Sequence, residues 1–174
     1  MNRRELNNGN EAFFRHIYFS ETAINVLKCK YNLLMYCYSG SAVIEINYKK
    51  YNVTPRTTIN LTYQDILMRI YVSSDFKGYC IAISPGLLMT EFNKHEFNFI
   101  SAFKRNCVIN WNEECAAYIE NLFKSVELCD KFDDEELTKS TILNQYICYI
   151  RLLKYHFQKN NLMAEKEVDA ISSK

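Results

Sequence analysis

The feature that most constrains the fold is a change in hydrophobic periodicity close to Ser84. Between Phe13 and Ile83, short apolar runs alternate with polar turn residues at spacings of roughly 8 to 12 residues, which is typical of an antiparallel sandwich or barrel. Beyond Ser84 the apolar residues recur at helical spacing instead. Because the strands come first and the helices follow, the order predicts an α+β domain and not alternating βαβ units.

Within the strand block the clearest prediction is a hairpin. Residues 31–38 and 42–46 form two apolar runs, and Ser39-Gly40-Ser41 between them is a turn sequence. Further strands are predicted at residues 23–27, 51–53, 57–62, 66–72, 77–83 and 108–110. Strict alternation in the 66–72 strand would place Ile66, Met68, Ile70 and Val72 on one face, and Leu67, Arg69 and Tyr71 on the other.

The helical part begins with recognisable capping residues. Ser84 followed by Pro85 predicts a short helix through Phe92, and a further helix is expected near residues 97–103. Asn112 with two acids after it predicts a helix to about residue 129. The acidic run 133–136 opens a longer helix that we expect to end near residue 160.

Composition excludes several classes of protein. The 174 residues carry a formal net charge of +1 with no block of like charges, so the chain lacks a basic nucleic-acid-binding surface. The seven cysteines form no Cys-x-x-Cys pair and are expected to be reduced and buried. The polar N-terminus is no signal peptide, and no apolar run is long enough to cross a bilayer. We therefore expect a cytoplasmic protein without a membrane partner.

The chain also lacks the residue patterns of an enzyme. His16, His95 and His156 are far apart, whereas a metal needs three or four convergent ligands, so no metal site is predicted. There is no Gly-x-Ser-x-Gly elbow and no glycine-rich phosphate loop. We expect no catalytic residues, no cofactor and no enzymatic activity.

Two sets of residues are candidates for binding. A ligand pocket inside the barrel would be lined by Tyr36, Tyr38, Met68, Arg69 and Tyr71. The alternative is that Arg69 faces solvent and the two tyrosines of the 31–38 strand pack in the core or at its rim. The last helix carries a wide apolar stripe, from which we assign dimerisation to Tyr146, Ile150, Leu153 and Phe157. The alternative is that this stripe packs wholly within the monomer.

Two segments of the chain resemble a known family in their amino-acid sequence as well as in their pattern of strands and helices. The run LLMYCYSGSAVIEI at residues 33–46 resembles the hairpin of cupin-type sensor domains in AraC-family transcriptional regulators, in particular the versions of Bacteroides-type bacteria. Residues 74–79 with IAISPGLL at residues 81–88 are similar to the end of that barrel and the entry to its helices. Two departures stand out: the turn at residues 54–57 lacks the glycine often found there, and no sugar-binding residues can be mapped.

The resemblance implies a cupin-like β-barrel or sandwich followed by a C-terminal pair of longer helices. It divides the chain into a flexible arm (residues 1–12), a cupin-like β domain with short helices (13–110), a helical dimerisation segment (111–160) and a linker (161–174). The linker would lead to a missing domain with two helix-turn-helix motifs.

The function expected from this division is effector sensing and dimerisation in a transcriptional regulator. The partners would be a second copy of the chain, a small-molecule effector, and DNA only through the missing domain. Two alternatives stay open: a stand-alone cupin-fold protein that binds a small molecule or has its barrel filled with side chains, and a metal-dependent cupin enzyme.

Overall fold

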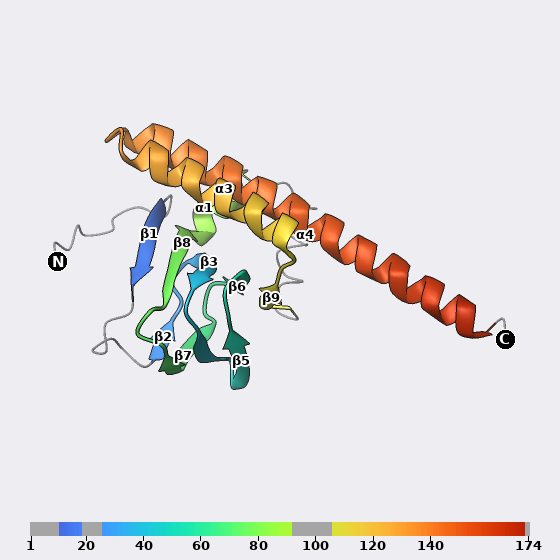
Figure 1. Ribbon diagram of the computed structural model, residues 1–174. Helices are drawn as coiled ribbons and strands as arrows, with labels where there is room; N and C mark the ends of the chain where they lie inside the picture. Colours follow the sequence, from blue (N-terminus) through green and yellow to red (C-terminus); the bar gives the residue numbers. More distant parts are fainter. Residues whose placement is uncertain (1–10, 19–25, 92–105, 173–174) are drawn as a thin grey trace.

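Two antiparallel sheets face each other, and a helical hairpin lies across the outer face of one of them (Figure 1). This computed structural model describes residues 11–18, 26–91 and 106–172, with side chains as far as Lys159. The predicted helix near residues 97–103 and most of the predicted N-terminal arm lie outside the described residues. The predicted α+β order, with a strand block followed by two C-terminal helices, is confirmed.

The sheet beneath the helices, here called the helix-covered sheet, has the strand order β1-β8-β3-β6-β9. Its strands are β1 (Ala12–Tyr18), β8 (Lys77–Ile83), β3 (Asn32–Ser39), β6 (Thr57–Leu61) and β9 (Val108–Asn110). The second sheet has the order β2-β7-β4-β5. Its strands are β2 (Val26–Lys28), β7 (Ile66–Val72), β4 (Ala42–Ile46) and β5 (Lys49–Val53). The strand β1 therefore begins at Ala12, the last residue of the segment predicted to be an arm.

A cluster of buried, mostly apolar side chains lies between the two sheets. Its buried members are Cys29, Cys37, Ala42, Ile44, Ile46, Val53, Ile59, Leu61, Leu67, Phe76 and Cys107. Gly40, in the predicted hairpin turn, has φ of 73°, and a Cβ there would lie 2.5 Å from the Phe76 backbone. Only glycine fits this turn, because the sandwich closes tightly against it.

A bulge in β7 breaks the alternation predicted for that strand. Val43 of β4 pairs with Tyr71, but the next residue, Ile44, pairs with Arg69. Ile70 is therefore an extra residue in the ladder. Ile70 and Tyr71 are 47% and 57% exposed, so neighbouring side chains both face solvent. The predicted placing of Tyr71 on the face of Leu67 is wrong, because the bulge shifts the register after Arg69.

The helices begin at the predicted caps. Ser84 Oγ accepts a hydrogen bond from the Leu87 amide (3.4 Å) at the start of α1 (Pro85–Glu91). Asn112 Oδ1 accepts one from the Cys115 amide (2.9 Å) at the start of α3 (Glu113–Asp130).

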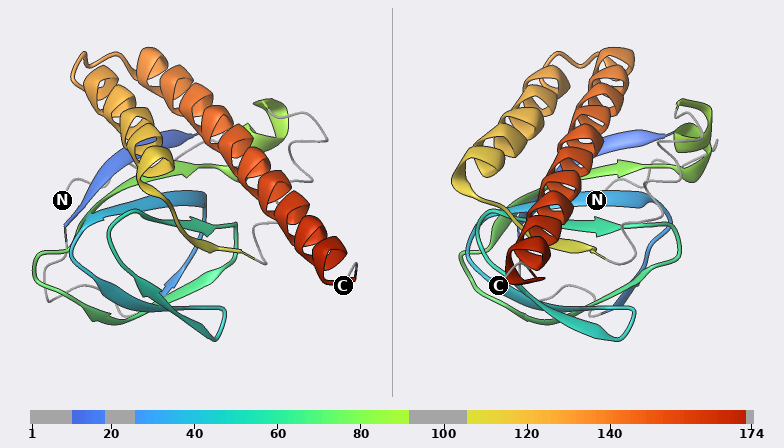
Figure 2. Two further views of the ribbon diagram at one scale, coloured as in Figure 1. Left: turned by 45° about the vertical axis from the view of Figure 1, so that its right-hand side comes forward. Right: turned by 90° about the vertical axis from the view of Figure 1, so that its right-hand side faces the viewer.

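The longest helix differs from its predicted bounds. The helix α4 spans Glu135–Ser172 and so continues past residue 160, where we expected a linker to begin. Residues 162–167 are leucine, methionine, alanine, glutamate and lysine, all strong helix formers, and these propensities continue the backbone where the apolar stripe has ended. Figure 2 shows the C-terminal part of α4 projecting from the body of the protein.

Candidate site between the sheet and the helices

The structure does not bring the five predicted pocket residues together. Tyr36 and Tyr38 share one face of β3, as predicted, but that face looks toward the helices and not into the sandwich. Tyr36 is 1% exposed, its hydroxyl donates to Glu120 Oε1 of α3 (2.9 Å), and its ring stacks on Phe123 at 6.0 Å between centroids. Tyr38 packs on Tyr79, with ring centroids 4.8 Å apart. Both tyrosines therefore pack in the core or at its rim, which was the alternative to their lining a ligand pocket.

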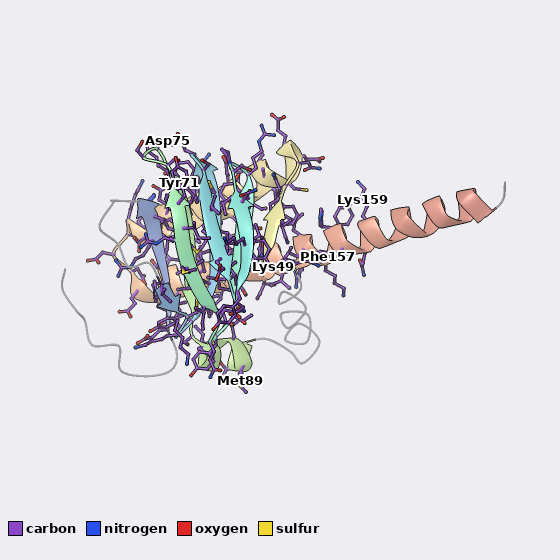
Figure 3. The ribbon with its side chains drawn as sticks, turned by 90° about the horizontal axis from the view of Figure 1, so that it is seen from below. Lys49, Tyr71, Asp75, Met89, Phe157 and Lys159 are labelled. Carbon is purple, nitrogen blue, oxygen red and sulfur yellow. The ribbon has the colours of Figure 1, made fainter. Side chains whose placement is uncertain are left out.

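The other three predicted pocket residues lie in the second sheet. Met68 pairs with Glu45, and Arg69 pairs with Ile44, which is buried in the sandwich interior. Residues directly opposite in a ladder share a face, so Arg69 lies toward the interior. Figure 3 shows Tyr71 beside the turn that carries Asp75. Since the three are divided between the two faces of a different sheet from Tyr36, no single pocket includes all five.

The stripe assigned to dimerisation is used inside the chain. Tyr146, Ile150 and Leu153 are 2%, 4% and 0% exposed, and all three belong to the core between α4, α3 and the helix-covered sheet. Phe157 is half-buried against the same core at the point where α4 leaves the body (Figure 3). The stripe therefore packs within the monomer, which was the alternative to dimerisation. An amphipathic helix first covers the core of its own domain.

A buried polar cluster joins β6, the end of β9 and α4. The Trp111 indole Nε1 donates to Thr58 Oγ1 at 2.7 Å, and the Tyr149 hydroxyl donates to the same oxygen at 3.0 Å. All three residues are at most 3% exposed. Asn60 is two residues beyond Thr58, on the same face of β6, and is 3% exposed. These four residues, here called the Thr58 cluster, lie between the sheet and the helix that projects from the body.

The Thr58 cluster is uncharged near neutral pH. Burial raises the pKa of Tyr149, while the Thr58 and Asn60 side chains oppose that rise. The ring of His156 lies 4.8 Å from that of Trp111, and burial lowers the pKa of this imidazole. The cluster therefore consists of neutral donors and acceptors in a buried aromatic layer, an arrangement that does not suit acid–base chemistry at pH 7.

Sequence reasoning missed the Thr58 cluster. Its one sequence signature is the alternation TTINLT at residues 57–62, in which polar residues recur on one face of a strand. The alternation alone predicts that this face is exposed to solvent. The helix that covers it, α4, is distant in sequence.

Other groups offer no comparable site. His16 Nε2 lies 3.4 Å from Glu127 Oε1, an ion pair only when the imidazole is protonated. Among the described residues, no three His, Cys, Asp or Glu side chains gather as a metal would need. Within the same residues, none of the helices has the length and apolar character to span a membrane.

Comparison with known proteins identifies the fold. No protein-family model and no curated protein matches the sequence. The apo structure of a variant of ToxT from Vibrio cholerae strain SCE256 aligns over 89% of this chain and 59% of that one, with 11% identity and a TM-score of 0.51. The chain has the fold of the ToxT N-terminal domain. ToxT is an AraC-family regulator, so the fold that the family resemblance implied is confirmed.

Two further structures have smaller TM-scores. Wild-type ToxT with bound unsaturated fatty acid aligns over 90% of this chain and 57% of its own, at 15% identity and a TM-score of 0.46. A cupin protein from Bacteroides fragilis aligns over 45% of this chain and 69% of its own, at 16% identity and a TM-score of 0.35. Our chain thus spans less than two thirds of either ToxT chain.

Proposed function

We propose that this chain is the effector-sensing domain of a transcriptional regulator of the AraC family. The observation that carries the proposal is the likeness of the whole fold, strand block and helical hairpin together, to the ToxT N-terminal domain. A sensing domain needs a site in contact with an element that can transmit a change. The Thr58 cluster is in this position, because Tyr149 belongs to α4.

The proposed mechanism is a population shift carried by α4. The Tyr149–Thr58 bond holds this helix on the helix-covered sheet, and the same helix continues to Ser172 beyond the body. A ligand that bound better when this contact was altered would favour one position of the helix, and the far end would move with it. Homodimerisation remains part of the proposal, through a surface other than the buried stripe of α4.

The proposal is tested on the natural gene and its full-length product. We expect the reading frame to continue beyond Lys174 into two helix-turn-helix motifs, and the full-length protein to bind its own promoter in a mobility-shift assay. A stop codon at that point would instead leave a free-standing cupin-fold binding protein.

We also propose that the chain is not an enzyme and acts in the cytoplasm. Its buried thiols and its neutral Thr58 cluster suit a binding role in a reducing compartment. Elemental analysis of the purified protein is the check on the first point. Stoichiometric iron, zinc or manganese would favour a metal-dependent cupin enzyme instead.

A further inference from the structure

The turn between α3 and α4 exposes three large apolar side chains. Leu128, Phe132 and Leu137 are 59%, 72% and 41% exposed. The Phe132 amide donates to the Cys129 carbonyl (3.0 Å), so the chain keeps a helical winding just past the end of α3. Phe132 therefore lies one turn beyond Leu128, on the same face. Figure 1 shows this turn at the end of the helical hairpin that is far from the C-terminus.

Leu137 belongs to the same surface. Thr141 Oγ1 donates to Cys129 Sγ (3.4 Å), and this bond fixes how the start of α4 lies against the end of α3. Leu137 precedes Thr141 by one helical turn, and Phe132 follows Cys129 by about one turn, so both lie on the same side of that bond. Exposed apolar side chains are ordinary when they are scattered singly, whereas grouped ones are typical of interaction surfaces.

The same turn is strongly acidic. Residues 128–137 carry five acids and one lysine, a net charge of −4, whereas the whole chain carries +1. The acids are all exposed, and among the described residues none of them forms an ion pair; they are Asp130, Asp133, Asp134, Glu135 and Glu136. Asp134 also caps α4, because its Oδ1 accepts from the Leu137 amide (2.9 Å). The three apolar residues and the five acids are here called the helical tip.

The charge of the helical tip limits what could cover it. A net negative surface repels nucleic acids and anionic lipids. A second copy in symmetric contact would place the same acids opposite one another, which is unfavourable. Within the part of the chain that the structure describes, no three His, Cys, Asp or Glu side chains are grouped as a metal ion would need. The complement of this surface is therefore a protein segment that is both basic and apolar.

We propose that the helical tip is a docking surface for a basic, amphipathic segment of another protein. Phe132 would be the anchor that enters the apolar face of the partner, and lysine or arginine side chains of the partner would pair with the surrounding acids. This proposal does not depend on the proposed function, because it uses only the exposure and the charge of the tip. Since α4 runs from the tip to Ser172, a partner bound here would contact the helix that projects from the body.

A designed peptide tests the chemistry of the proposed partner. We would label an amphipathic helical peptide, with leucines on one face and lysines on the other, and follow its fluorescence anisotropy as the protein is added. We expect saturable binding that weakens as the salt concentration rises. The matched peptide, in which glutamate replaces each lysine, should not bind. Equal binding of the two peptides, or binding of neither, would overturn the proposal.

Substitutions test where the lysine peptide binds. Phe132→Ser removes the most exposed apolar side chain of the tip and should weaken binding about tenfold or more. Tyr155→Ser is the matched control, because this side chain is 57% exposed on α4 away from the tip, and it should leave binding unchanged. Both variants should keep the circular dichroism spectrum and the urea midpoint of the parent protein, since neither side chain is buried.

Two results with Phe132→Ser would overturn the proposal. Unchanged peptide binding would show that the peptide binds another surface. A lower mass than that of the parent protein in light scattering would show that a second copy of the chain covers the tip.

Discussion

At the residue scale, two adjacent residues of the hairpin between β4 and β5 have left-handed backbone conformations. Asn47 and Tyr48 have φ of 48° and 69°, the pair of positive values that a type I′ turn requires. Asn47 suits the turn, since its side chain donates to Asp65 Oδ1 (2.7 Å) and accepts from the Ile66 amide (2.9 Å). Tyr48 has no such compensation, because its side chain is 87% exposed.

Replacing Tyr48 with glycine should therefore stabilise the protein. A left-handed conformation costs an L-residue roughly 1–2 kcal/mol, and glycine avoids this at an entropic cost of about 0.5–1 kcal/mol. We expect Tyr48→Gly to raise the free energy of unfolding in urea by about 0.5–1 kcal/mol. Lys50→Gly, at an exposed position of β5, is the matched control and should lower it by a similar amount. A less stable Tyr48→Gly would show that the tyrosine makes a contact that outweighs the strain.

At the scale of elements, the packing of α4 on the helix-covered sheet decides what its residues can do. One apolar stripe covers the domain core through Ile150 and Leu153, and the Tyr149–Thr58 bond fixes the register of the helix on β6. A second contact, from Tyr36 to Glu120, does the same for α3. The hairpin is therefore held by two buried hydroxyls as well as by apolar area.

Leu153→Asp distinguishes a core residue from an interface residue. Leu153 is 0% exposed, so a carboxylate there should unfold the hairpin, and we expect a loss of about 4 kcal/mol or more in the free energy of unfolding. Lys154→Asp, on the exposed side of the same turn, should leave stability nearly unchanged. Circular dichroism and light scattering would be recorded on both. A folded Leu153→Asp protein of reduced mass would restore the dimerisation assignment.

At the scale of the whole molecule, buried thiols and phenols limit the pH range of the fold. Burial raises the pKa of Cys29 to about 12 and that of Cys37 to about 11, from an ordinary value near 9. Burial likewise raises the pKa of Tyr36, Tyr146 and Tyr149. At a pH between the ordinary pKa of each group and its raised pKa in the folded protein, the unfolded chain loses protons that the folded chain retains. This difference favours unfolding.

Stability should therefore be complete below about pH 9 and fall progressively as the pH rises toward 12. Circular dichroism under reducing conditions would follow unfolding, and absorbance at 295 nm would follow tyrosine ionisation. We expect part of the phenolate signal to appear together with unfolding. A thiol reagent that modified Cys29 or Cys37 rapidly in the folded protein at pH 8 would contradict this account.

Much of the fold was predictable because its cues are local. The bounds of β4, β7, β8 and β9 follow from apolar runs and turn residues, and the caps Ser84 and Asn112 follow from the preference of helix ends for side-chain acceptors. The bulge at Ile70 was not predictable, since it depends on the partner strand. The end of α4 was missed because helix propensity continued after the apolar stripe had ended.

The sequence by itself determined the order of strands and helices, the likeness of the fold to a known family and the alternation of faces in strands without a bulge, all of which depend on neighbours a few residues apart. Only the tertiary structure decided which layer each face enters. Tyr36 faces the helices, the stripe around Leu153 is internal, and Asn60 lies buried beside Tyr149 of α4. The physical reason is that burial depends on elements far apart in sequence. The sequence neighbours of Asn60 predict an exposed side chain, but Tyr149, 89 residues later, covers it.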